Sequence, residues 1–240
     1  LPSSFTYGAL VSACEKGGRW QEAYRLFEEM LDSGLRPNTI THSAMISACE
    51  KGDQWRLALR LLADACRGGP PPDLIAYNAS ISACEKGRQW QRALRLLSDL
   101  RRRGLVPDVV THNALISACG RSSLWASACS LLSDLRAARL APSAISYGSA
   151  MLGCAEAKML PALLELLDDM RSHRVPLEAP SCGLLLAECE ESGHLDREVD
   201  LLGATAAAAA GSPGGRGRLE SFGGLGLGAV AADAAAMRLL

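Results

Sequence analysis

The sequence predicts an all-α fold, an α-solenoid in which 35-residue helix-turn-helix repeats stack in register into a superhelix of either hand. Three observations predict it: one cysteine recurs every 35 residues, the text around it recurs too, and each repeat holds two helix-like stretches separated by turn residues. The recurring cysteines are Cys14, Cys49, Cys84, Cys119, Cys154 and Cys189. Self-similarity at a fixed period of this size indicates stacked supersecondary units, which bind along an extended surface.

Aligned on these cysteines, the chain divides into five clear units, a weaker sixth and a tail. The five units span residues 4–38, 39–73, 74–108, 109–143 and 144–178. Residues 179–202 are rich in acidic side chains, as expected of a degenerate or capping repeat that faces water. Residues 203–240 form an Ala/Gly-rich low-complexity tail, to which we assign no packed fold.

The first stretch of each unit predicts a helix that is buried on most sides. In the fourth unit we expect Thr111 to cap this helix, which then runs from His112 through Cys119 with apolar residues on most faces. In the first three units Gly17, Gly52 and Gly87 follow, and we expect them to take the left-handed turn after the helix end.

The second stretch of each unit predicts an amphipathic helix. In residues 89–103 apolar side chains recur at helical spacing between arginines and an aspartate. Glycine and proline close the unit at Gly34, Gly104, Pro37, Pro72, Pro107 and Pro142. Neither helix buries its apolar face alone, so the units must stack. Small residues such as Ala48 and Ala83 favour close approach of neighbouring helices.

Composition excludes several classes of protein. Lys plus Arg total 25 against 26 for Asp plus Glu, so any affinity for a polyanion must come from local charge placement. Cysteines at one register of stacked units are too far apart for disulfides, and we interpret them as reduced thiols in a reducing compartment rather than as a metal ladder. The chain has no run of about 20 apolar residues, so we expect a soluble protein without a membrane span. Because Leu1 is not methionine, we expect the native start to be missing, and no targeting segment is readable.

No catalytic constellation is visible. Phosphate loops, the G-x-S-x-G elbow, the H-E-x-x-H helix and the zinc-deaminase signature do not occur, so we expect no enzyme activity, cofactor or metal. His42 and His112 alternate with tyrosines at one register and are interpreted as framework residues. Four tryptophans also share a register, where core packing is favoured over base stacking. They are Trp20, Trp55, Trp90 and Trp125.

Residues 109–119 with the ending Leu140-Ala141-Pro142, and residues 74–78 with 104–108, resemble the pentatricopeptide repeat. The resemblance covers about residues 4–178, with tryptophan where that family usually has an aliphatic residue. It implies a protein that binds single-stranded RNA, with one base per repeat, and acts in processing, stability, translation or editing of transcripts in the mitochondrion or chloroplast. It also implies RNA-processing or editing proteins as partners.

The resemblance assigns roles by position in the repeat. The fifth and last residues of a unit contact the base edge, and the second residue wedges between bases. The base-binding pairs are Gly8 with Asn38, Ser43 with Asp73, Asn78 with Asp108, Asn113 with Ser143, and more weakly Gly148 with Glu178. The wedge residues are Phe5, Ile40, Ile75, Val110 and Ile145. Together with donor and acceptor matching, the resemblance then implies a core 5′-A-G-U-C/U-3′. Four readers do not specify a transcript, so we expect a fragment of a longer array or reliance on partners.

A cation recurs at the end of the first helix, at Lys16, Lys51, Lys86 and Arg121. Two interpretations stay open: contact with the RNA backbone, and a solvated helix end whose dipole favours a cation. Arg101, Arg102 and Arg103 allow the same two readings. At the level of the whole protein the rivals to RNA binding are a helical-repeat scaffold for protein–protein interaction and a degenerate gene product of which only the array folds.

Overall fold

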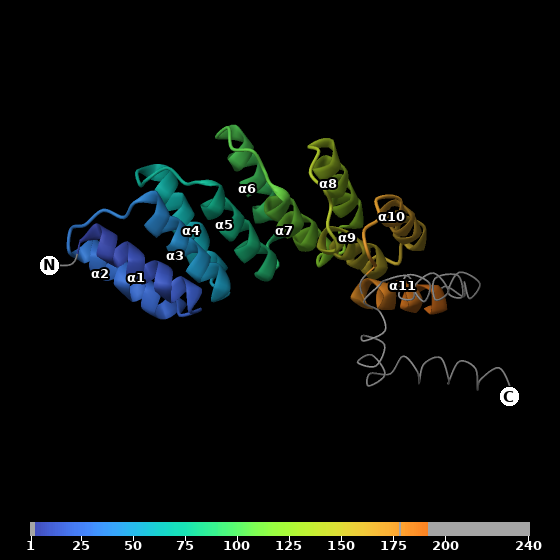
Figure 1. The fold of residues 1–240 in the computed structure, drawn as a ribbon, viewed down its shortest axis with the longest axis horizontal. Helices are drawn as coiled ribbons and strands as arrows, with labels where there is room; N and C mark the ends of the chain where they lie inside the picture. Colours follow the sequence, from blue (N-terminus) through green and yellow to red (C-terminus); the bar gives the residue numbers. More distant parts are fainter. Residues whose placement is uncertain (1–2, 178, 192–240) are drawn as a thin grey trace, which may run out of the picture. The chain divides into compact units, whose positions relative to one another are not determined.

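The computed structural model describes residues 3–177 and 179–191, and all regular structure within them is α-helical. The all-α repeat fold is therefore confirmed. The helices are α1 Ser4–Lys16, α2 Trp20–Asp32, α3 Thr39–Lys51, α4 Trp55–Arg67, α5 Leu74–Lys86, α6 Trp90–Arg102, α7 Val109–Gly120, α8 Trp125–Ala137, α9 Ala144–Glu156, α10 Leu160–Ser172 and α11 Ala179–Glu191 (Figure 1). Glu178, the second helix predicted for the sixth unit and the tail at 203–240 lie outside the described residues.

The chain divides into two compact units, 1–184 and 185–240, and of the second only the end of α11 is described. Within the first, the odd-numbered helices α1 to α9 form one layer in which each contacts the next (Figure 1). Each even-numbered helix packs on the odd-numbered helix before it, and α2, α4, α6 and α8 also contact the one after it. The odd-numbered layer therefore carries the continuity of the array.

The odd-numbered helices begin one residue after the end of the preceding unit, so the prediction that Thr111 caps a helix is wrong. Asp108 is the N-cap of α7, and Thr111 is the third helical residue, whose N–H the Asp108 carboxylate accepts at 2.8 Å. The last residues of other units cap α3, α5 and α9 in the same way, as Asn38, Asp73 and Ser143. An oxygen-bearing side chain is favoured there because it accepts an N–H that the helix leaves unpaired.

The prediction of a left-handed backbone at Gly17, Gly52 and Gly87 is also wrong. Their φ angles are −80°, −90° and −77°, and the left-handed residue is the next one, for example Asp53 with a φ of 58°. Gly52 meets a packing requirement instead. A Cβ atom built on it would overlap the indole ring of Trp20 from the preceding unit. Gly87 lies against Trp55 in the same manner.

The core consists of the odd-numbered helices and the inner faces of their partners. Ala48, Ala83 and Ala118 are at most 2% exposed, as the small-residue pattern predicts. The closest approach joins α7 and α9, where a Cβ on Gly153 would lie 2.9 Å from the Gly120 Cα. Five register cysteines, Cys14, Cys49, Cys84, Cys119 and Cys154, are buried free thiols, and Cys189 is also buried.

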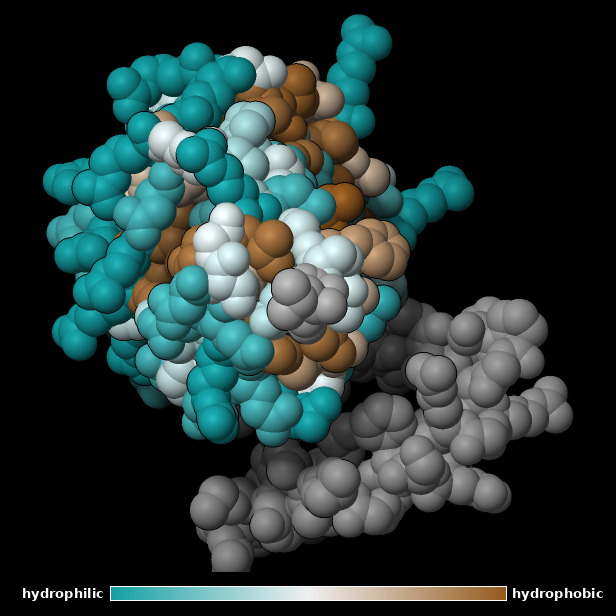
Figure 2. Space-filling model, turned by 90° about the vertical axis from the view of Figure 1, so that its left-hand side faces the viewer, coloured by the Kyte–Doolittle hydropathy of each residue, from teal (hydrophilic) through white to brown (hydrophobic). Residues whose placement is uncertain are grey.

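The side of α1 that faces away from α3 keeps apolar residues at the surface. Leu10 is 44% exposed, whereas its register equivalent Met45 is completely buried. Figure 2 views the molecule from this end and shows apolar residues among polar ones. None of the described helices combines the length and the apolar character needed to cross a membrane.

Candidate nucleic-acid interface

A row of exposed apolar side chains follows the odd-numbered helices, one from the second residue of each. Phe5, Ile40, Ile75, Val110 and Ile145 are 83%, 71%, 61%, 55% and 62% exposed. Water-exposed large apolar side chains at one repeating register are costly unless a partner covers them. These are the predicted wedge residues, and the described structure leaves each of them accessible.

The structure brings the fifth and last residues of two units into contact. The Ser43 hydroxyl donates to the Asp73 carboxylate with Oγ and Oδ1 2.8 Å apart. The Asn78 amide Nδ2 lies 3.1 Å from Oδ1 and 3.2 Å from Oδ2 of Asp108. Residues 30 positions apart thus meet because the fifth residue of one odd-numbered helix lies beside the N-cap of the following odd-numbered helix.

The other two pairs are arranged differently. Asn113 and Ser143 are linked through Ser146, whose hydroxyl donates to Asn113 Oδ1 at 2.6 Å and lies 3.2 Å from the Ser143 hydroxyl. Gly8 brings no side chain, so Asn38 alone offers polar groups there. Its Oδ1 accepts the N–H of Thr41, which leaves the Asn38 amide nitrogen for a ligand.

Burial differs among these residues. Asn78, Asp108 and Asp73 are half-buried and Asn38 is exposed, so their polar groups are reachable from solvent. Ser43 is only 4% exposed, and its hydroxyl is shared between the Thr39 carbonyl and Asp73. In the second unit the Asp73 carboxylate is therefore more accessible to a ligand than the Ser43 hydroxyl.

Asp108 is held in its ionised form. Burial raises the pKa of its carboxyl, but hydrogen bonds from Thr111 and from the Asn78 amide outweigh burial and leave the pKa below its ordinary value. An ionised carboxylate only accepts hydrogen bonds. A base that contacts Asp108 must therefore offer an N–H group.

The cations at the ends of the odd-numbered helices pair with carboxylates of the preceding unit. The Lys51 Nζ lies 2.5 Å from Glu15 Oε1, and the Lys86 Nζ lies 2.7 Å from Glu50 Oε1. Arg121 continues the series, with Nε 3.1 Å from Oε1 of Glu85. Each of these three cations therefore has a carboxylate partner in the preceding unit, and we name the arrangement the inter-unit ion-pair ladder. Contact of these cations with the RNA backbone stays a prediction.

The ladder stops at the fifth unit. The next cation position is occupied by Glu156 and the next carboxylate position by Gly120, so both partners change together. Because a Glu and a cation 36 residues apart recur three times, the sequence held the signal for this ladder, which our sequence analysis missed.

The five repeats thus share a 35-residue period and an exposed apolar second residue, and two of them bring the fifth and last residues into direct contact. Two sequence models of one protein family match this chain. The model described as the PPR repeat family matches residues 2–51 and 72–121, and the model described as the PPR repeat matches residues 40–69 and 110–140. The chain belongs to the pentatricopeptide repeat (PPR) family.

Solved structures agree on the fold. The crystal structure of the pentatricopeptide repeat protein PPR10 from maize is 24% identical with a TM-score of 0.63, covering 86% of this chain and 30% of that one. PPR10 in complex with an 18-nt psaJ RNA element is 20% identical with a TM-score of 0.57, covering 86% and 34%. The PPR domain of Arabidopsis thaliana protein-only RNase P 1, in complex with tRNA, is 19% identical with a TM-score of 0.63, covering 75% and 95%.

The chain therefore spans about a third of the length of PPR10. A search of curated protein sequences gave no match.

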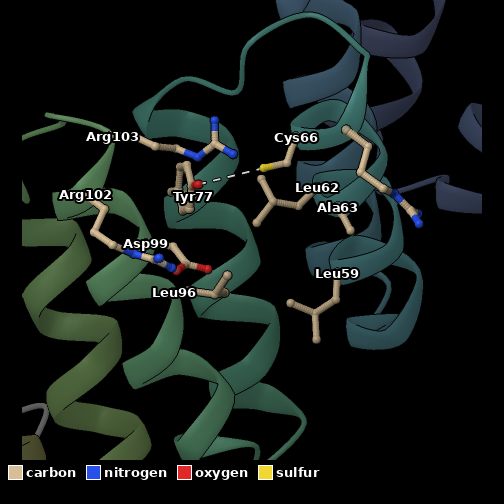
Figure 3. Close-up of a pocket in the computed structure, with 10 residues that line it drawn as sticks. Leu59, Leu62, Ala63, Cys66, Tyr77, Leu96, Asp99, Arg102 and Arg103 are labelled. Atoms are coloured by element: carbon tan, nitrogen blue, oxygen red, sulfur yellow. Dashed lines mark hydrogen bonds and ion pairs between the residues drawn. The ribbon is translucent and has the colours of Figure 1, made fainter.

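Two of the grooves in this PPR array lie between even-numbered helices. One, of about 470 Å³, lies between α4 and α6, with Tyr77 of α5 between them (Figure 3). Its rim carries Arg102 and Arg103 of the basic run, and the Tyr77 hydroxyl lies 3.9 Å from the Cys66 Sγ. The other, of about 590 Å³, lies between α2 and α4 above the buried His42.

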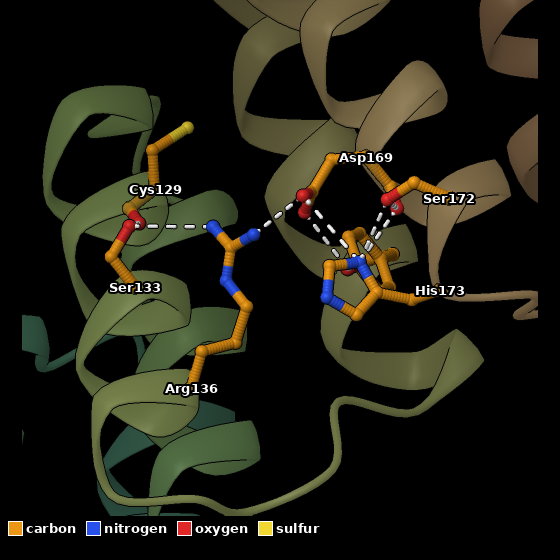
Figure 4. Close-up of polar contacts among 7 residues, drawn as sticks. Cys129, Ser133, Arg136, Asp169, Ser172 and His173 are labelled. Atoms are coloured by element: carbon orange, nitrogen blue, oxygen red, sulfur yellow. Dashed lines mark hydrogen bonds and ion pairs between the residues drawn. The ribbon is translucent and has the colours of Figure 1, made fainter.

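Further along the array, polar contacts join α8 and α10. Figure 4 shows Arg136 of α8 directed at Asp169 of α10, with Nη1 2.5 Å from Oδ1. Asp169 also accepts the Tyr147 hydroxyl at 2.8 Å. The ion pair joins neighbouring units through their even-numbered helices, so we interpret these contacts as stabilising the stack of repeats.

The tryptophans also join units. Each ring is half-buried, and Trp55 contacts Gly87 of the following unit while the guanidinium carbons of Arg56 and Arg92 lie 5.0 Å and 4.9 Å from its ring centre. Two cations over one ring leave little room for a base.

Among the described residues no group of three or more His, Cys, Asp or Glu is placed to hold a metal ion.

Proposed function

We propose that this PPR chain binds single-stranded RNA along its odd-numbered helices, one base per repeat. The observation that carries the proposal is the combination, at one register, of a polar pair and an exposed apolar side chain. Asn78 with Asp108 is the clearest pair, and Ile75 and Val110 flank it along the row. Stiff β-branched side chains grip base faces without competing for the polar edges.

The base preferences follow from donors and acceptors. The carboxylates of Asp73 and Asp108 only accept, which favours guanine or uracil because these bases carry a ring N–H. With the family pattern this gives guanine at the second unit, uracil at the third, a pyrimidine at the fourth and adenine at the first. The proposed core is 5′-A-G-U-C/U-3′, read parallel to the chain.

We further propose a non-catalytic role in organellar RNA processing, stability, translation or editing. The support is family membership and the RNA-bound state of two structural neighbours, PPR10 with its psaJ element and the RNase P domain with tRNA. In this role the chain would protect a segment of RNA or recruit a processing or editing protein to it.

Binding of short fluorescent RNAs, measured by anisotropy, tests the proposal. We expect an RNA with the core A-G-U-C to bind more tightly than its permutations. Alanine at Asn78 and Asp108 together should weaken binding by about 5- to 150-fold, since one good base contact discriminates by about 1 to 3 kcal/mol. Equal affinity for all permutations, with no loss in the double variant, would refute base reading.

Salt dependence measures the contribution of phosphates. Because Lys51, Lys86 and Arg121 already have carboxylate partners, we expect a shallow dependence of affinity on salt, equivalent to only a few released ions.

The rival function is a scaffold for a peptide. The observation that favours it is the pair of grooves between even-numbered helices, which are lined by leucines and arginines, together with a net charge of −1. Variants in the groove between α4 and α6, such as Leu59→Glu, separate the two functions. Under RNA binding they leave RNA affinity unchanged.

A further inference from the structure

The hydroxyl of Thr111 lies within the candidate base site, although it cannot reach a ligand. Thr111 is completely buried as the third residue of α7. Its Oγ1 accepts the backbone N–H of Asp108 at 3.2 Å and donates to Asn78 Oδ1 at 2.5 Å. Asp108 Oδ1, at 2.9 Å, is a second acceptor for the same hydroxyl proton. A side chain of the following repeat thus holds the fifth residue of this one.

These bonds fix the orientation of the Asn78 amide. With the amide oxygen on Thr111, the nitrogen faces Asp108 and donates to its carboxylate. The reverse orientation would place the amide oxygen against carboxylate oxygens, which repel it, and would leave the threonine proton without this acceptor. One N–H of Asn78 remains for a base acceptor.

Other units of the same chain show the same dependence. Asn113, the other asparagine at the fifth position, has its Oδ1 bound by the hydroxyl of Ser146, which is also completely buried. Where the fifth residue is glycine, a hydroxyl fills the space of the missing side chain, with Thr41 Oγ1 2.8 Å from a Cβ at Gly8. Ser181 Oγ lies 3.0 Å from a Cβ at Gly148.

The second unit provides the contrast. Its fifth residue is Ser43, which bonds Asp73 directly, and the corresponding third residue is Ala76, which has no hydroxyl. The residue three places after the unit end therefore varies with the fifth residue: a hydroxyl where an amide must be oriented or a glycine replaced, and alanine where serine needs no orientation.

We propose that the third residue of the following repeat is a positioning residue that determines base preference by orienting the fifth-position amide. Thr111 acts on Asn78, and Ser146 acts on Asn113. This inference rests on the proposed RNA function. In the third and fourth units the base is then selected by three side chains, and the third belongs to the next unit and never touches the base.

The test compares Thr111→Val, which keeps shape and removes the hydroxyl, with Thr111→Ser, which keeps the hydroxyl. Affinities are measured for four RNAs that differ only at the base opposite the third unit, and for four that differ only opposite the second unit. We expect Thr111→Val to reduce the preference for uracil by about 2- to 10-fold, the value of one net hydrogen bond. Thr111→Ser should retain it, and preference at the second unit should not change.

A hydroxyl that served only to cap α7 gives another result. Thr111→Val would then weaken all of these RNAs equally and leave discrimination intact, which overturns the inference while the proposed function stands. If the wild-type chain shows no base preference at all, the proposed function fails and the inference fails with it.

A gain-of-function pair keeps the test decisive if Thr111→Val unfolds. Ser43→Asn alone should give the second unit a weak uracil preference, and Ser43→Asn with Ala76→Thr should strengthen it by the same factor. Equal preferences in the single and double variants would contradict a positioning role.

Discussion

Asp108 performs two tasks, since it caps α7 and contacts Asn78, the residue proposed to read a base. Both depend on its charge, because an ionised carboxylate is a stronger acceptor than a neutral one. The sequence alone indicated the second task through the family pattern, but it did not indicate the first. Thr111 is also a good capping residue by type, so only the three-dimensional start of the helix distinguishes the two.

The charge of Asp108 predicts a pH dependence of stability. Its pKa is lowered from 3.8 by the bonds from Thr111 and Asn78, which outweigh the opposing effect of burial, so its contribution is complete above pH 3.8. The contribution is lost as pH falls through the lower pKa of the folded state. Thermal melts between pH 7 and pH 2.5 should therefore show that Asp108→Asn flattens this acid loss. An unchanged acid profile would show that the carboxylate gains nothing from folding.

The cysteines predict a graded reactivity. Burial raises the pKa of Cys49 to about 12 and that of Cys84 to about 11, so both stay protonated at pH 8, whereas Cys66 is exposed. Iodoacetamide at pH 8 should modify Cys66 first, as read by mass spectrometry of peptides, and the register cysteines only after unfolding. Early modification of Cys49 or Cys84 would contradict their place in the core.

At the scale of helices, the close contact of α7 and α9 requires glycine at position 120. Gly120 lies against the Ser149 carbonyl group, and backbone cannot rotate away as a side chain can. The sequence showed small residues at the helix contacts, yet it gave no reason for glycine rather than glutamate at this position of the fourth unit. The two changes occur together: Gly120 stands where the ladder would have its next carboxylate, and Glu156 stands where it would have the next cation.

Gly120→Ala should destabilise the array by about 1 to 3 kcal/mol, the usual cost of overpacking, despite alanine's better helix propensity. Chemical denaturation measures the change. Gly183→Ala is the control because a Cβ there meets nothing within 4 Å, and it should be neutral or slightly stabilising. Equal effects of the two changes would mean that the contact between α7 and α9 is not tight.

The inter-unit ion-pair ladder is expected to contribute modestly. Lys86 is 36% exposed and Glu50 19%, so a double-mutant cycle with Lys86→Gln and Glu50→Gln should give a coupling of about 0.2 to 1 kcal/mol. Lys86→Gln should change RNA affinity less than Asn78→Ala does. A larger loss from Lys86→Gln would restore the phosphate interpretation of this register.

At the scale of the whole molecule, the period of 35 residues predicted the helix pairs and their stacking, because units that cannot bury their own faces must bury them on their neighbours. The fifth and last residues were also identified from the sequence, with their contact following once adjacent helices stack in register. The Trp–Gly contacts, the ion-pair ladder and the Thr111 hydroxyl were not predicted. Each joins residues of two units about one period apart, and a reading of one unit at a time does not reveal them.

The central claim is that a polar pair in each repeat selects one base. Selection from randomised RNA with the wild-type chain and with Asn78→Ser tests it most directly, since the variant recreates in the third unit the Ser–Asp pair of the second. We predict that the wild type enriches A-G-U followed by C or U, and that the variant enriches guanine at the third base with the other positions unchanged. Recovery of no common motif from the wild type, or of the same motif from both chains, would contradict the account.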